Sequence, residues 1–154
     1  MSSRIQITRH EEFEASHILT GYDGGCGRLH GHSYRIEVTV EGPQHDPFGM
    51  IMDFQDLKRA IKLVIPDHYF IYTENDPVGM DIAATLRRHA ISSIAYPFVT
   101  TAENMAPYFA KEIEELIQNR LGYADVQVVR VDLWETANSH ATYIRNRGRR
   151  EGDN

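Results

Sequence analysis

Residues 17–34 contain three of the eight histidines and the single cysteine of the chain. Two of them, His30 and His32, lead directly into residues 33–42, where apolar and polar side chains alternate as in a half-buried β-strand. Successive side chains of a strand point to opposite faces, so both histidines share one face if the strand begins at His30. The pair indicates the start of a metal site, although two hydrogen-bonded surface histidines would give the same pattern.

A third histidine ends the preceding alternating segment. His17 shares the face of Phe13 and Ala15 in that segment, and an adjacent strand would bring it close to the other two. Three protein ligands with a fourth position open to water or substrate are typical of catalytic zinc. His17, His30 and His32 are therefore the predicted metal ligands.

Cys26 lies in a glycine-rich stretch that favours an exposed loop over a packed core. Three roles are open to it: a fourth zinc ligand, a small buried hydrophobe, or a nucleophile or base beside the metal. A neighbouring metal cation and Arg28 would favour its thiolate form. In that form Cys26 could accept a proton.

Two acidic positions farther along the chain also suggest chemistry. Glu135 shares a strand face with Val131 and Leu133, and a carboxylate on an apolar face needs a partner. That partner is either a basic side chain of this protein or a ligand with paired N–H donors. Asp67 and His68 follow a predicted helix, where a turn cap and a surface histidine are the simpler interpretation.

These residues are expected to be positioned by one α+β domain spanning residues 1–154, with a flexible tail over about 146–154. We find no repeat, linker or low-complexity tract that divides the chain. The predicted elements are strands 4–17 and 33–42, helices 53–65 and 100–120, and strands 126–136 and 141–146, the last two joined as a hairpin.

Local signals set the predicted helix ends. Asp53 is a candidate N-cap, Thr100 and Glu103 form a capping-box pattern, and Pro107 is expected in the first turn. The long connection between the two helices is predicted to hold a short helix at 81–89. The apolar stripes expected to face the sheet are Phe54, Leu57, Ile61 and Val64 in one helix and Met105, Phe109, Ile113 and Leu116 in the other.

Composition narrows the function classes. The net charge of -6 argues against general nucleic-acid binding. The absence of a long apolar run or signal-peptide core, together with one cysteine, predicts a cytoplasmic protein with no membrane partner. Four arginines near the end of the sequence are expected to be solvated, namely Arg145, Arg147, Arg149 and Arg150.

The motifs FEASH, CGRLHGHSY, MDFQDLK, DHYF, TAEN and WET occur in this order along nearly the whole chain. In this respect the sequence resembles the 6-pyruvoyltetrahydropterin synthase superfamily, most closely its bacterial 6-carboxytetrahydropterin synthase branch. The resemblance implies the tunnelling fold, a four-stranded antiparallel sheet with two helices on one face (ββααββ). It also implies a barrel-like homo-oligomer, a hexamer made of two trimers, with active sites between subunits.

The resemblance further implies a role for each matching residue. His17, His30 and His32 would bind Zn²⁺, and Cys26, Asp67 and His68 would form the catalytic triad. Glu135 would anchor the amino and ring N–H groups of a pterin, with Thr101 beside it.

The implied reaction converts 7,8-dihydroneopterin triphosphate into 6-carboxy-5,6,7,8-tetrahydropterin, acetaldehyde and triphosphate, in queuosine or deazapurine biosynthesis. The three residues between Cys26 and His30 match the carboxy branch, whereas the pyruvoyl branch, which keeps the side-chain carbons, has a longer gap. A non-catalytic zinc-binding oligomer is the alternative of another class. The long segment 77–97 carries Arg87 and Arg88, which could form a phosphate pocket.

Overall fold

The computed structural model describes residues 4–146, so the predicted tail lies almost wholly outside the described residues. The longest strands, β1 (Ile5–His17) and β2 (His30–Gly42), pair antiparallel along their whole length. The other elements are η1 (Gly25–Gly27), α1 (Phe54–Val64), β3 (Tyr69–Thr73), α2 (Pro77–Arg88), β4 (Ser93–Tyr96), α3 (Ala102–Asn119), β5 (Gln127–Thr136) and β6 (Ser139–Ile144).

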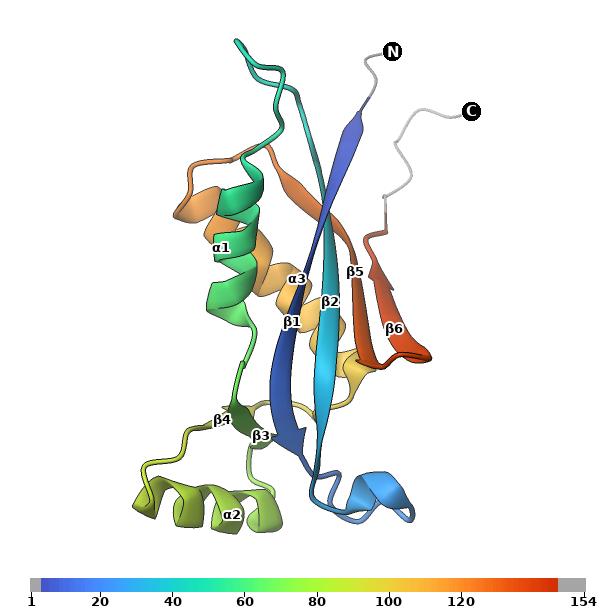
Figure 1. Cartoon of the computed structure of the whole chain (residues 1–154), viewed down its shortest axis with the longest axis vertical. Helices are drawn as coiled ribbons and strands as arrows, with labels where there is room; N and C mark the ends of the chain where they lie inside the picture. The colour runs from blue at the N-terminus through green and yellow to red at the C-terminus, as the bar shows by residue number, and fades with distance from the viewer. Residues whose placement is uncertain (1–3, 147–154) are drawn as a thin grey trace.

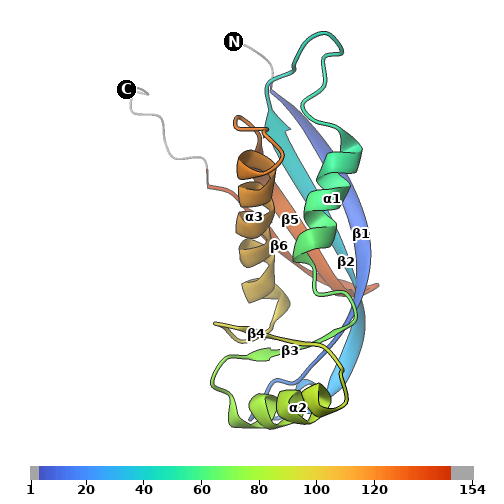
Figure 2. The same cartoon turned by 90° about the vertical axis from the view of Figure 1, so that its left-hand side faces the viewer.

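The strands form one sheet in the order β4-β3-β1-β2-β5-β6, as Figure 1 shows for its main part. Helices α1 and α3 both cover the same face of this sheet (Figure 2). The alternation predicted for β2 is observed, because its apolar residues are buried toward the helices. The buried core residues of β2 and α3 include Tyr34, Ile36, Val38, Val40, Met105, Phe109 and Ile113.

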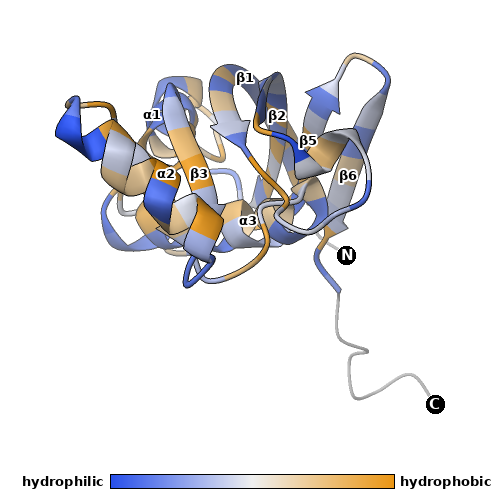
Figure 3. Cartoon of the chain, turned by 90° about the horizontal axis from the view of Figure 1, so that it is seen from below, coloured by the Kyte–Doolittle hydropathy of each residue, from blue (hydrophilic) through white to orange (hydrophobic). Residues whose placement is uncertain are grey.

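The prediction of a four-stranded sheet with two helices is incomplete, since residues 4–146 form six strands and three α-helices. The four predicted strands form the antiparallel part, and β3 and β4 extend it as parallel strands. Helix α2 connects β3 to β4, as a parallel pair requires a crossover. Seen from below, hydrophobic residues run along β3 and are mixed with hydrophilic ones on α2 (Figure 3).

The N-terminal part of α3 differs from the prediction. Its N-cap is Thr101, and no side chain caps the helix, so the Thr100 and Glu103 capping box is not formed. Because the helix begins at Ala102, Pro107 lies in its second turn instead of the first. Thr100 does not cap the helix but is fully buried, and its carbonyl oxygen contacts a histidine described below.

Two surface predictions also need correction. Phe54, expected in the apolar stripe of α1, is half exposed, whereas Leu57 and Ile61 are buried as predicted. Arg145, expected to be solvated, forms an ion pair with Glu114 of α3. The backbone of the chain continues the β5 pairing at this point, which brings the guanidinium to the helix. The other three arginines lie outside the described residues.

Within residues 4–146, no helix combines the length and apolar character that crossing a membrane requires.

Candidate metal centre and active site

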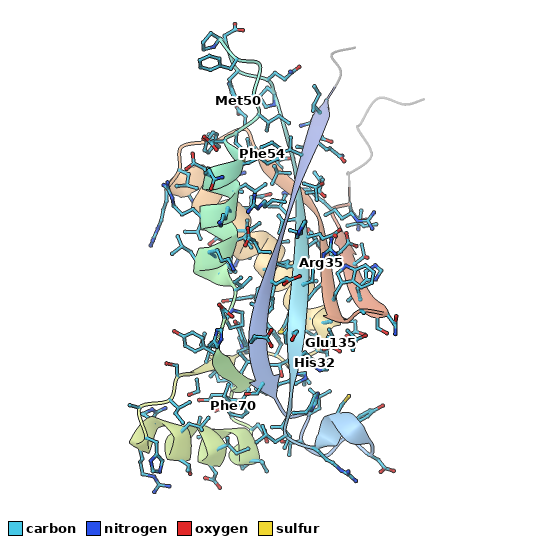
Figure 4. The ribbon with its side chains drawn as sticks, in the orientation of Figure 1. His32, Arg35, Met50, Phe54, Phe70 and Glu135 are labelled. Atoms are coloured by element: carbon cyan, nitrogen blue, oxygen red, sulfur yellow. The ribbon has the colours of Figure 1, made fainter. Side chains whose placement is uncertain are left out.

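The antiparallel register of β1 and β2 places His17 directly opposite His30. His32 lies two residues farther along β2 and so shares the face of His30. The Nε2 atoms of His17 and His30 are 3.0 Å apart, and those of His30 and His32 are 3.1 Å apart. The three predicted ligands therefore converge on one point at the lower end of the sheet, near the label of His32 in Figure 4.

Two backbone carbonyls fix the orientation of the imidazoles. Nδ1 of His17 lies 2.8 Å from the Thr100 carbonyl oxygen, and Nδ1 of His30 lies 2.7 Å from that of Arg28. A carbonyl only accepts, so each Nδ1 carries the proton and each Nε2 presents a lone pair. Such hydrogen bonds are the usual outer support of metal-binding histidines.

The cluster fits a small tetrahedral cation. With Zn–N bonds of about 2.0–2.1 Å, neighbouring ligand atoms of a tetrahedron are separated by about 3.3 Å, close to the two observed spacings. Two lone pairs at 3.0 Å repel each other unless a cation lies between them. Three imidazoles suit zinc and leave one coordination position open.

Burial favours the neutral form of two of the three imidazoles. It lowers the pKa of His17 to about 4, and repulsion from His30 and His32 acts in the same direction. The pKa of His32 is also lowered, first by burial and then by His30. Neutral imidazole is the form that binds a metal, so no proton has to be displaced from these two residues near pH 7.

Cys26 lies in η1, in the loop between β1 and β2, and is exposed as predicted. The loop closes on itself through a hydrogen bond from the Leu19 N–H to the Cys26 carbonyl. The thiol does not belong to the converging group of ligands in the part of the chain that the structure describes. Of the three roles left open by the sequence, a buried hydrophobe is therefore excluded by the exposure of Cys26.

Asp67 and His68 form a hydrogen-bonded pair beside the C-terminal part of β1. Oδ1 of Asp67 accepts hydrogen bonds from the Glu14 N–H at 3.0 Å and from Nδ1 of His68 at 2.9 Å. The hydrogen bond from Glu14 is the main cause that lowers the pKa of Asp67. His68 has a φ of 65°, a strained value for a residue other than glycine. Its backbone N–H donates to the Glu14 carbonyl, which fixes the main chain at this residue. The ring is oriented by the Nδ1 bond to Asp67, and Nε2 has no partner among residues 4–146.

No hydrogen bond or ion pair joins Cys26 to Asp67 or His68 within residues 4–146. The structure thus brings together the three metal ligands, and separately the Asp67–His68 pair. It forms no hydrogen bond or ion pair between the thiol and that pair among the described residues.

Glu135 lies near the end of β5, and Figure 4 shows it at the same end of the sheet as His32. Its side chain makes no hydrogen bond or ion pair with any described residue. Burial raises the pKa of Glu135, and the nearby carboxylate of Glu103 in α3 raises it further. Thr101 begins α3 without using its hydroxyl as a cap. A ligand with N–H donors would satisfy the Glu135 carboxylate, whereas the open N-terminal end of α3 presents backbone N–H groups that need an acceptor.

Helix α2 contributes to a groove that also reaches His32 of the metal cluster. A groove of about 450 Å³ is lined by residues that include His32, His68 and Leu86. It shares Tyr69 with a polar pocket of about 350 Å³ that Arg87 lines. Arg87 therefore lies next to the groove, whereas Arg88 bonds to Thr85 on its own helix.

Comparison with known proteins agrees with this geometry. The profile of the family described as 6-pyruvoyl tetrahydropterin synthase matches residues 6–146. The chain belongs to this family. Within the 6-pyruvoyl tetrahydropterin synthase family, it is 34% identical over 146 residues to a Haemophilus influenzae protein named 6-carboxy-5,6,7,8-tetrahydropterin synthase, covering 90% of this chain and 98% of that one. A protein of the same name from Aquifex aeolicus is 37% identical over 121 residues, covering 77% and 75%.

Two solved structures share the fold of this chain. An uncharacterised protein from Wolinella succinogenes superposes with a TM-score of 0.70 at 24% identity, covering 94% of this chain and 100% of that one. The 6-pyruvoyl tetrahydropterin synthase of Caenorhabditis elegans gives a TM-score of 0.65 at 22% identity, covering 94% and 97%.

Sequence reasoning missed three contributors to the site. The carbonyls of Thr100 and Arg28 orient imidazoles, and no sequence pattern marks a backbone acceptor. Glu103 acts on Glu135 across the gap between α3 and β5, whereas the capping-box pattern suggested a purely local role. A second acid near a site is recognisable only once the helix is placed on the sheet.

Proposed function

We propose that this chain is a zinc-dependent 6-carboxy-5,6,7,8-tetrahydropterin synthase of queuosine or deazapurine biosynthesis. It converts 7,8-dihydroneopterin triphosphate and water into 6-carboxy-5,6,7,8-tetrahydropterin, acetaldehyde and triphosphate, a carbon–carbon lyase reaction. The observation that carries the proposal is the convergence of three imidazoles near Glu135, a partly buried carboxylate without a cationic partner in the described part of the chain. The names of the relatives from Haemophilus influenzae and Aquifex aeolicus support the same reaction.

Each residue of the site has a part in this proposal. Glu135 accepts the paired N–H groups of the pterin, and Thr101 contacts the ring beside it. When bound, zinc supplies Lewis acidity toward the side-chain hydroxyls of the substrate. Cys26 moves a proton at that side chain, and His68, oriented by Asp67, offers its free Nε2 as the partner acid or base.

We also propose a homohexamer with active sites between subunits. Strand β6 is an open edge of the sheet, and β1 pairs with β3 only through Ala15 and Ser16, so most of β1 is open as well. The two open edges belong to different strands, so the β6 edge of one subunit is expected to pair with the β1 edge of the next. Repeated head-to-tail pairing of this kind closes the subunits into a ring. Such a ring would let Cys26 of one subunit meet His68 of the next.

The zinc-loaded protein is expected to release acetaldehyde from 7,8-dihydroneopterin triphosphate. The assay measures aldehyde together with the mass of the pterin product. A pterin that keeps its three-carbon side chain, with no acetaldehyde, would identify a pyruvoyl synthase. Unchanged substrate would identify a non-catalytic zinc-binding oligomer.

Arg87→Ala is expected to weaken binding of the triphosphate substrate by about tenfold or more, because charge-assisted hydrogen bonds to phosphate are among the stronger polar contacts. Binding of 7,8-dihydroneopterin, which lacks the phosphates, should not change. Arg88→Ala is the matched control, since Arg88 is bonded to Thr85. If Arg87→Ala loses the same affinity for the triphosphate substrate and for 7,8-dihydroneopterin, or loses affinity for neither, the phosphates bind elsewhere.

A further inference from the structure

The hydroxyl of Tyr34 is a buried donor that lacks a partner. Tyr34 is 0% exposed, and its hydroxyl makes no hydrogen bond to any of residues 4–146. Buried polar groups in folded proteins are nearly always hydrogen-bonded, and leaving one unpaired costs free energy. The side chain cannot turn away easily, because its ring stacks on Phe13 with centroids 4.8 Å apart.

Tyr34 belongs to the face that carries the metal cluster. It follows His32 by two residues on β2, and the ring centroids of the two are 5.2 Å apart. Strands β2 and β5 pair Arg35 with Trp134. Continuing that register by one residue sets Tyr34 beside Glu135.

The phenol of Tyr34 has an O–H group that can donate one hydrogen bond. Nearby, Glu135 offers only acceptor oxygens when ionised, so the two side chains present opposite hydrogen-bonding groups.

We propose that the Tyr34 hydroxyl donates a hydrogen bond to an acceptor atom of the pterin ring, beside the N–H groups bound by Glu135. This inference rests on the proposed function, and it makes Tyr34 a specificity-determining residue. A pterin carries a carbonyl oxygen and ring nitrogens next to its N–H donors. Heterocycles that lack an acceptor at this position would leave the phenol unpaired and bind less tightly.

Tyr34→Phe removes only the hydroxyl and tests the proposal in two independent ways. In the zinc-loaded variant, affinity for 7,8-dihydroneopterin should fall about three- to tenfold in calorimetric titration, with zinc content unchanged. Without ligand, the denaturation midpoint of the variant should equal or exceed that of the wild type, because an unpaired buried group has been removed.

Tyr123→Phe is the matched control. Its hydroxyl bonds to Asp56 at 2.6 Å, in the contact between α1 and the loop before β5. This variant should lose stability and keep its pterin affinity, the reverse of Tyr34→Phe. A drop in stability of ligand-free Tyr34→Phe would show that its hydroxyl already has a partner, and would overturn the proposal.

Glu135→Gln separates this proposal from the function it rests on. If Glu135→Gln loses pterin affinity while Tyr34→Phe binds like the wild type, the pterin site is right and the role of Tyr34 is wrong. If the wild-type protein fails to bind 7,8-dihydroneopterin, both proposals are overturned.

Discussion

Replacing His32 with alanine is expected to remove most of the zinc from the purified protein. The wild type should carry about one zinc per chain, because three imidazole ligands and one exchangeable position complete a tetrahedral site. Two remaining nitrogens, those of His17 and His30, are too few to hold the ion through purification. Metal analysis of dialysed protein measures the loss directly.

Thermal stability gives a second measurement of the same change. A ligand that binds the folded state stabilises it by about 2.7 kcal/mol at a hundredfold excess over its dissociation constant. Zinc should therefore raise the melting temperature of the wild type and leave that of His32→Ala unchanged. His10→Ala, which alters an exposed histidine outside the cluster, should behave like the wild type. Full zinc occupancy in His32→Ala would remove His32 from the site.

The metal centre was accessible to sequence analysis because strand periodicity decides which way a side chain points. Alternation places His17 with Phe13 and Ala15, and the two buried apolar residues confirm that face. The remaining step, that β1 pairs with β2, follows because strands that are consecutive in the sequence usually lie side by side. The opposition of His17 and His30 then depends on the register, which the sequence alone leaves undefined.

The added strands could not be predicted in the same way. Strands β3 and β4 are five and four residues long, too short for periodicity to separate a strand from a loop. Their pairing is parallel and depends on a distant strand. Helix α2, in contrast, has a readable start: Asp76 accepts a hydrogen bond from the Gly79 N–H as N-cap, and Pro77 follows at the first position. The predicted start at residue 81 overlooked this signal.

Contacts between residues far apart in the sequence could not be predicted from the sequence either. Thr100 contacts His17 across 83 positions of sequence, and only the packing of α3 on the sheet brings them together. The predicted capping box failed because the burial of Thr100 moved the cap to Thr101. Glu135 was placed on the correct face by alternation, but whether a basic residue reaches it depends on the whole fold.

Cys26→Ala is expected to lower turnover by about 10²- to 10⁴-fold, the usual contribution of a general acid or base. Zinc content and affinity for 7,8-dihydroneopterin should remain, because the thiol is exposed and lies outside the converging ligand group of the described residues. Steady-state kinetics with zinc-loaded protein, followed by acetaldehyde release, measures the change. Loss of zinc together with activity would instead make Cys26 a fourth ligand, and unchanged turnover would remove it from the chemistry.

The same variant tests whether two chains build each site. Within residues 4–146, the thiol makes no hydrogen bond to His68, and in the proposed assembly the two meet across a subunit boundary. Cys26→Ala and His68→Ala are each expected to be inactive alone. After unfolding, mixing in equal amounts and refolding, random assembly pairs an intact Cys26 with an intact His68 at about a quarter of the sites, and a similar share of activity should return. If mixing restores nothing although the subunits exchange, the thiol and the Asp67–His68 pair do not meet across the interface.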